Sequence, residues 1–132
     1  MKKLFISCPM RDRSDEAIAE SRKRLKMIAE AAFNEELEVI DSIVSERPPV
    51  NSKESIWHLG NSIKKLAEAD YFIGINYSSH FRGCDVERNI AQRYGIPTFC
   101  VPLYIFPDAF ELEEHEYDEE ECSKEIFHVS NF

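Results

Sequence analysis

Short apolar runs alternate with longer stretches of helical spacing along the first hundred residues of the chain. The apolar runs 4–7, 37–40, 71–75 and 98–101 have the length and composition of strands. The run 71–75 is continuously apolar, as expected for a strand that is covered on both faces of a parallel sheet. The pattern therefore predicts four strands.

Three helices are predicted between these strands. Apolar residues at helical spacing cover Ile18 to Ala32, Ile56 to Leu66 with an end near Ala69–Asp70, and Val86 to Ala91. Ser14 is suited to cap the first helix, and Gly95 followed by Pro97 is typical of a helix end. The β-α-β-α-β-α-β alternation predicts an α/β fold, a single doubly wound (flavodoxin- or Rossmann-like) parallel sheet flanked by helices.

Charge divides the chain into a neutral body and an acidic tail. Residues 1–107 carry 15 acidic and 15 basic side chains, whereas residues 108–132 carry 10 acidic and one basic, which accounts for the net charge of −9. We interpret 1–107 as one domain and 108–132 as an acidic C-terminal extension, either a solvated helix or a disordered tail. Its apolar end, 126–132, is expected to dock on the body or on a partner subunit, unless it frays. A neutral body argues against binding a nucleic-acid polymer.

Scattered cysteines and histidines give no sign of a metal site or a disulfide framework. The four cysteines form no Cys-x-x-Cys pair, and no histidine pair has zinc spacing. The chain has no apolar run of membrane-spanning length, and its N-terminus reads better as a strand than as an export signal. We expect a cytoplasmic protein with reduced cysteines, no metal, no cofactor and no membrane partner.

One carboxylate is singled out by the logic of the fold. Ligands of open parallel sheets bind beyond the carboxyl ends of the strands, here the segments 8–11, 76–87 and 102–104. Glu87 lies in the second of them, near the first turn of a helix that we expect to start around Gly83. A helix N-terminus would keep it ionised, and an ionised carboxylate can attack a sugar anomeric carbon. The alternative is a glutamate that only complements the helix dipole.

Two arginines are the predicted anion contacts of the same pocket. Arg11 and Arg82 follow the first and third strands, and a guanidinium fits phosphate oxygens. Arg82 has the alternative of pairing with Asp85 or Glu87.

Several further side chains are candidates for the pocket. Hydroxyl donors to sugar or phosphate are predicted at Ser7, Ser78 and Ser79. Phe5 and Tyr77 could stack on a base, although a strand phenylalanine is more often part of the core. Cys84, near a helix start, could have a lowered pKa. Because no histidine is reliably positioned to activate it, a cysteine nucleophile is disfavoured.

Three segments carry a resemblance to a known family. The first strand and loop 4–10, the helix-to-strand junction 66–73, and the Arg-Gly-Cys-Asp-Val-Glu helix running from 82 to Gly-Ile-Pro at 97 resemble the nucleoside 2-deoxyribosyltransferase-like family. This family includes deoxynucleoside monophosphate N-hydrolases and short phage and bacterial relatives. The resemblance covers residues 3–102 and rests on the order and spacing of the motifs.

The resemblance implies roles for individual residues. Glu87 falls on the family nucleophile and Arg11 on a basic residue near the 5′-phosphate. Phe5 replaces a tyrosine, Cys8 replaces a glycine, and Ser62 replaces an aspartate that orients the sugar or protonates the leaving base. The predicted substrate-binding set is Phe5, Ser7, Cys8, Pro9, Met10, Arg11, Ser62, Asn76, Ser78, Ser79, Arg82 and Gly83.

Two functions follow as expectations. The first is cleavage or transfer of the N-glycosidic bond of a deoxynucleoside or its monophosphate, by a deoxyribosyltransferase or nucleotide N-glycosidase with Glu87 as the catalytic residue. The second is a non-catalytic nucleotide or nucleotide-signal binding protein on the same fold. Ser62 in the position of the family aspartate favours the second, and the Arg-Gly context of Glu87 favours the first. The resemblance also implies a homo-oligomer.

Overall fold

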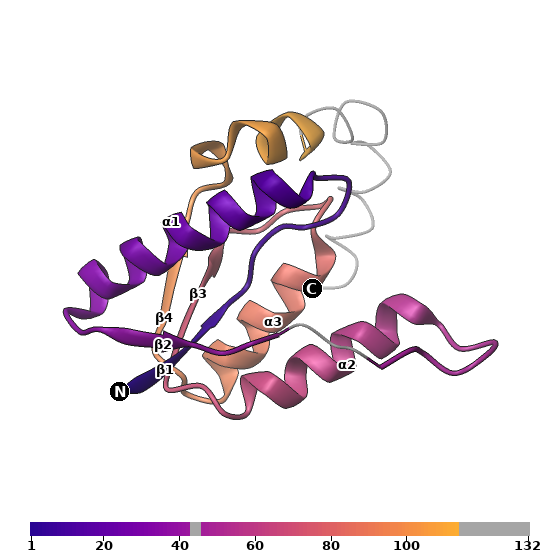
Figure 1. The fold of residues 1–132 in the computed structure, drawn as a ribbon, viewed down its shortest axis with the longest axis horizontal. Helices are drawn as coiled ribbons and strands as arrows, with labels where there is room; N and C mark the ends of the chain where they lie inside the picture. The colour runs from indigo at the N-terminus through magenta and orange to yellow at the C-terminus, as the bar shows by residue number, and fades with distance from the viewer. Residues whose placement is uncertain (43–45, 114–132) are drawn as a thin grey trace.

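A four-stranded, all-parallel sheet forms the centre of the protein (Figure 1). The computed structural model describes residues 1–42 and 46–113. The strands are β1 (Lys2–Ile6), β2 (Leu37–Val39), β3 (Tyr71–Ile75) and β4 (Thr98–Val101), in the order β2-β1-β3-β4. This is the strand order of a flavodoxin-like doubly wound sheet, so the predicted fold class is confirmed.

The helices cover both faces of this sheet. Helix α1 (Asp15–Phe33) lies on one face, and α2 (Glu54–Leu66) and α3 (Arg82–Arg93) lie on the other (Figure 1). After β4 the chain forms the short 3-10 helix η1 (Leu103–Ile105) and then a helical segment over residues 107–113, which lies on the α1 side. Residues 107–113 therefore continue the folded body past the predicted domain boundary.

Alternating strand residues supply two apolar cores. Leu4 and Ile6 of β1 pack with Leu25 and Ala29 of α1, all of them buried. The intervening Phe5 faces the other side, where it packs in the core formed with Phe72 and residues of α2 and α3. The period of two along β1 thus places neighbouring residues in opposite layers.

Local sequence signals place the helix ends with small differences from the prediction. Ser14 caps α1 as expected, because its hydroxyl accepts a hydrogen bond from the Ala17 N–H at 3.1 Å. Helix α2 ends at Leu66 rather than near Asp70. The Asp70 carboxylate instead accepts a hydrogen bond of 2.8 Å from the backbone N–H of Lys3. This bond holds the segment between α2 and β3 against β1.

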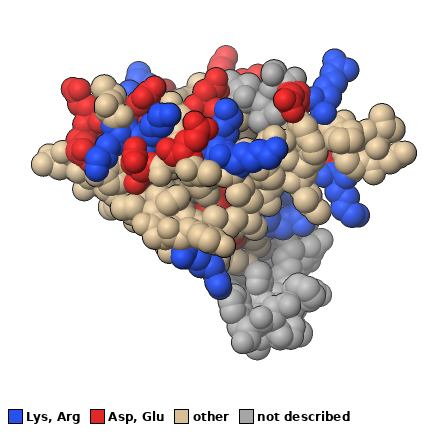
Figure 2. All heavy atoms as spheres, turned by 90° about the horizontal axis from the view of Figure 1, so that it is seen from below, with Lys and Arg blue, Asp and Glu red and all other residues tan. Residues whose placement is uncertain are grey.

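Charged side chains are interspersed on the surface. Figure 2 shows basic and acidic side chains intermixed along one edge of the face it displays, beside a broad uncharged area. Interspersed charges fit the balanced composition of residues 1–107. None of the helices in the described part of the chain is both long and apolar enough to cross a bilayer.

Candidate functional site

A pocket of about 570 Å³ opens where the strand order reverses, beyond the carboxyl ends of β1 and β3. Four segments line it: the loop after β1, helix α2, the loop after β3 and the first turns of α3. Arg11 and Glu87 both lie in its wall, so the prediction that the loops after strands one and three share a cleft is confirmed.

The pocket gathers about half of the predicted site residues. Those that line it are Cys8, Met10, Arg11, Ser62, Arg82, Gly83 and Glu87. A site of this size can hold a small molecule, since ligand pockets typically measure about 300–1,000 Å³. The chemistry available there depends on how Glu87 is held.

Two serine hydroxyls surround the buried carboxylate of Glu87. The Glu87 side chain belongs to the second turn of α3, and the residue is only 9% exposed. Ser7, directly after β1, donates a hydrogen bond of 2.7 Å from its Oγ to Oε1 of Glu87. The Ser62 hydroxyl, from α2, lies near enough to lower the pKa of this carboxylate. Glu87 is therefore held by a residue that follows β1, and it lines the pocket.

The expected effect of the helix N-terminus on Glu87 is wrong. Helix α3 begins at Arg82, one residue earlier than predicted, so Asp85 is the acidic residue of the first turn and Glu87 lies beyond it. The helix dipole acts mainly within the first turn. Burial dominates instead and raises the pKa of Glu87, and the hydroxyls of Ser7 and Ser62 offset only part of that rise.

The two predicted arginines lie at the pocket wall but are exposed. The side chain of Arg11 is 57% exposed and its Nε lies 3.7 Å from a carboxylate oxygen of Asp12. Arg82 is exposed at the first position of α3. Asp85, one of its suggested partners, pairs instead with Arg88 at 2.9 Å. Both guanidinium groups can thus reach an anionic ligand from the rim of the pocket.

Two histidines of the pocket wall were missed by the sequence analysis. His58 lines the pocket from α2, and His80 lines it from the loop after β3. Burial lowers the pKa of His80, and the nearby charge of Arg11 lowers it further. Two positions in the sequence could have indicated them. His80 falls inside the segment 76–87, which the fold already placed at the pocket, and His58 lies one helical turn before the predicted site residue Ser62.

The cysteines of the site are poor nucleophiles. Burial raises the pKa of Cys84 to about 12, so the prediction of a lowered pKa near the helix start is wrong. Burial also raises the pKa of Cys8, against the opposing charge of Arg13. Cys8, Cys84 and Cys100 are free thiols, as predicted, and Cys122 lies outside the described residues.

The other predicted binding residues lie elsewhere. Phe5 stacks on Phe72 in the core, with ring centroids 5.8 Å apart, and does not line the pocket. The buried Pro9 accepts a hydrogen bond of 2.7 Å from Arg13 through its carbonyl. Asn76 is exposed at the end of β3.

The serines of the loop after β3 bind another part of the chain. Ser78 and Ser79 donate to the carboxylate of Glu113 rather than into the pocket. Within residues 1–42 and 46–113, no three His, Cys, Asp or Glu side chains form a group that could hold a metal ion.

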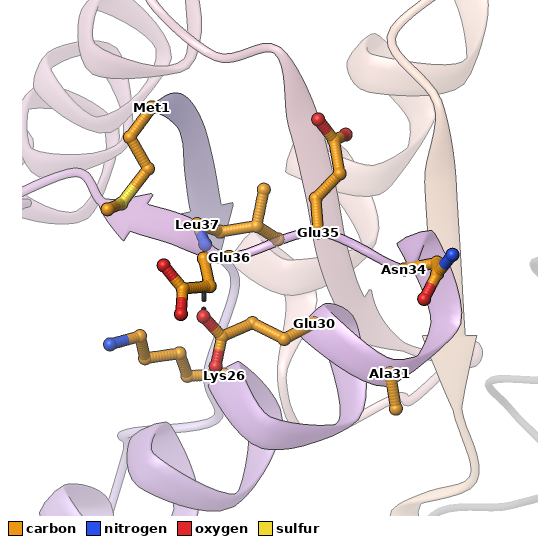
Figure 3. A pocket seen from close by; sticks show the side chains of 8 residues that line it. All are labelled: Met1, Lys26, Glu30, Ala31, Asn34, Glu35, Glu36 and Leu37. Atoms are coloured by element: carbon orange, nitrogen blue, oxygen red, sulfur yellow. Dashed lines mark hydrogen bonds between the residues drawn. The ribbon is translucent and has the colours of Figure 1, made fainter.

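A second hollow lies at the opposite edge of the sheet and offers no comparable chemistry. It measures about 650 Å³ and is lined by residues from the end of α1 and the start of β2 (Figure 3). Two of its carboxylates serve the fold. Glu30 accepts a hydrogen bond of 3.0 Å from the backbone N–H of Leu37 (Figure 3). Glu35 accepts one from the hydroxyl of Tyr71. This hollow also lies at the amino ends of the strands, away from the usual ligand position.

Comparisons with family models, with curated proteins and with solved structures return no match for this chain.

Proposed function

We propose that this protein cleaves the N-glycosidic bond of a deoxynucleoside or deoxynucleoside monophosphate, with Glu87 as the nucleophile. The observation that carries the proposal is a buried carboxylate that lines a ligand-sized pocket and is oriented by the hydroxyl of Ser7, with Ser62 in the same pocket wall. A carboxylate that merely complements a helix dipole needs neither a pocket nor such orientation. The motif resemblance around residues 82–97 supports the same role.

The proposed chemistry needs one bond exchange at the sugar. The ionised Glu87 carboxylate attacks the anomeric carbon as the bond from this carbon to the base nitrogen breaks, which gives a glycosyl ester and a free base. The departing base takes up a proton. Water then attacks the ester, releasing deoxyribose or its phosphate and restoring Glu87; a second base in place of water would give transfer instead.

Proton transfer to the leaving base cannot come from Ser62, which is not a carboxylic acid. His58 and His80 lie in the pocket wall, and imidazole side chains exchange protons near neutral pH. Because a lowered pKa favours the neutral form of His80, we assign the proton transfer to His58, with Arg11 and Arg82 as water-screened contacts for an anionic group at the rim.

The deciding experiment is release of free base from a panel of deoxynucleosides and deoxynucleotides. Glu87→Gln should abolish release while the protein remains folded, because the amide has nearly the same shape and is a far poorer nucleophile. Glu111→Gln, which changes the same charge at an exposed position, is the matched control and should leave release unchanged. Wild-type release that survives Glu87→Gln would refute the role of Glu87.

The serine at position 62 favours a second candidate, a non-catalytic nucleotide-binding protein. In that case the wild type releases no base from any member of the panel. Glu87→Gln then changes only the affinity for a bound nucleoside or nucleotide, measured by calorimetry. The two candidates thus make opposite predictions for base release by the wild type.

A further inference from the structure

The loop Ser78–His80, after β3, surrounds the carboxylate of Glu113 with four hydrogen-bond donors. Oε1 accepts from the backbone N–H of Ser79 at 2.8 Å and from its hydroxyl at 2.9 Å. Oε2 accepts from the hydroxyl of Ser78 at 2.5 Å and from the backbone N–H of His80 at 2.7 Å. Glu113 lies more than thirty residues away in the sequence, so this loop binds the carboxylate of another segment of the chain.

The arrangement has the chemistry of an oxyanion site. Successive backbone N–H groups and hydroxyls that converge on one point form a concavity that binds phosphate as well as carboxylate. Burial alone would raise the pKa of Glu113, but the hydrogen bonds from Ser78, His80 and Ser79 outweigh it and leave the pKa below its ordinary value. The loop therefore holds a negatively charged group at neutral pH.

This oxyanion loop adjoins the pocket. The side chain of His80 lines the pocket, while its backbone N–H points at Glu113. Ser78 Oγ also accepts a hydrogen bond of 3.1 Å from the N–H of Phe81, the next residue of the pocket wall. On its other side the Ser78 N–H donates to Asp85, whose charge is compensated by Arg88. The loop therefore borders the pocket on the β3 side through His80 and Phe81.

We propose that the Ser78–His80 loop is an oxyanion subsite of the pocket and that Glu113 fills it, so that the pocket takes an uncharged deoxynucleoside rather than its monophosphate. This inference rests on the proposed function for the identity of the ligand. The bound carboxylate removes the donors that a phosphate would use and repels its charge. Arg11 and Arg82 are exposed, and water screens their attraction for a phosphate.

Removal of Glu113 should uncover the subsite. Glu113→Ala is compared with Glu111→Ala, an equal charge change at an exposed position of the same helical segment. Inorganic phosphate should raise the melting temperature of Glu113→Ala and leave wild type and Glu111→Ala unchanged. The affinity of Glu113→Ala for a deoxynucleoside 5′-monophosphate should rise at least about tenfold, with little change for the nucleoside, as expected for one charge-assisted hydrogen-bonding site. Adding Ser79→Ala to Glu113→Ala should remove both gains.

The outcomes separate this inference from the proposed function. A Glu113→Ala protein that folds but gains no phosphate binding overturns the subsite, whatever the nucleoside result. A wild type that binds the monophosphate more tightly than the nucleoside also overturns it, and this measurement decides the matter if the variant does not fold. If phosphate binding appears in Glu113→Ala but no protein binds or cleaves a nucleoside or nucleotide, the subsite stands and the proposed function fails.

Discussion

The hydroxyl of Ser7 lies 2.7 Å from Oε1 of Glu87, which joins the end of the first strand to a helix eighty residues later in the sequence. Ser7 is 1% exposed and its side chain cannot turn to bulk water. Its own backbone N–H is held by the carbonyl of Ile73 at 2.9 Å. The position of the Glu87 carboxylate therefore depends on the pairing of β1 with β3.

Replacing Ser7 with alanine should raise the pKa of Glu87 further, because burial of the carboxylate would then be opposed by one hydroxyl fewer. We expect a loss of about 1.5–3 kcal/mol of unfolding free energy, the range for a hydrogen bond to a charged group. The acidic limb of the pH–activity profile should move to higher pH. Ser55→Ala, at an exposed serine of the same pocket, is the control and should leave both unchanged. An unmoved profile in Ser7→Ala would contradict the assignment.

Gly74 leaves room for the packing beside Ser7. A Cβ at this position would lie 2.8 Å from Cε1 of Phe72 and 3.3 Å from Cβ of Ser7. Because Phe72 is fully buried and stacks on Phe5, its ring has little room to shift. Gly74→Ala should therefore cost about 1–3 kcal/mol, the range for overpacked cores, and should lower base release through Ser7.

Gly60 provides the matched control for this substitution. It lies within α2, and a Cβ there would meet nothing within 4 Å. Gly60→Ala should stabilise the protein by about 0.5–1 kcal/mol, because alanine is the better helix former. Urea unfolding of both variants tests the pair, and equal effects would contradict the packing argument.

The parts of the fold that follow from local pattern were predicted from the sequence. Strands 71–75 and 98–101 match the structure residue for residue. The run 71–75 is buried along almost its whole length, as a strand covered on both faces should be. The pocket position was also predictable, because in doubly wound sheets it is fixed by topology. Ser14 at the N-cap of α1 needed only the local sequence.

The site chemistry depended on contacts between distant segments and could not be predicted. Whether Glu87 sits in the first or second turn of α3 depends on a helix start that shifted by one residue. The hydroxyls that oppose the effect of its burial belong to Ser7 and Ser62, which no periodicity connects with it. The hydroxyls of Ser78 and Ser79 were correctly placed in the loop after β3, but their partner Glu113 lies in a segment assigned to the acidic tail.

Arg13 should be a main determinant of stability. Its side chain is 1% exposed and bonds to Asp108 at 2.7 and 3.0 Å, to the carbonyl of Pro9 at 2.7 Å and to Ser21 at 2.7 Å. Arg13→Lys keeps the charge but loses the planar guanidinium group that makes these hydrogen bonds. We therefore expect a loss of about 2–4 kcal/mol of unfolding free energy, which is below the upper range for buried ion pairs because Asp108 is half exposed. Arg24→Lys, where a single hydrogen bond reaches Ile105, should cost far less.

The ion pair of Arg13 with Asp108 predicts that the stability of the protein falls in acid. The hydrogen bond from Arg13 lowers the pKa of Asp108, so the stability that this carboxylate contributes is present above its unfolded pKa, about 4, and is lost as pH falls through its lower folded value. Asp108→Asn should therefore be less stable than wild type at neutral pH, and the difference should shrink toward about pH 3. A difference that is constant across this range would show that the charge of Asp108 does not contribute.

The last prediction concerns the stability cost of the Glu87 charge. Burial is the main reason that the pKa of Glu87 is raised, so the folded protein binds its proton more tightly than the unfolded chain does. The stability contributed by this group is then greatest below its unfolded pKa and is lost as pH rises through the folded pKa. Glu87→Gln removes the ionisation and, through the adjoining pocket, leaves the new amide in reach of water.

Glu87→Gln should consequently be more stable than wild type at about pH 8, by about 1.4 kcal/mol for each unit by which the pKa is raised, and the gain should vanish toward about pH 4. A glutamate that complements the helix dipole would give the opposite sign, a loss of about 0.3–1 kcal/mol at neutral pH. Thermal unfolding across this pH range, with Glu111→Gln as the exposed control, separates the two. A variant that is less stable than wild type at about pH 8 would mean that the hydroxyls of Ser7 and Ser62, and not burial, control the energetics of this carboxylate. A stabilised variant that also loses base release would show that the protein tolerates an energetically costly charge at the position where the proposed reaction needs a nucleophile.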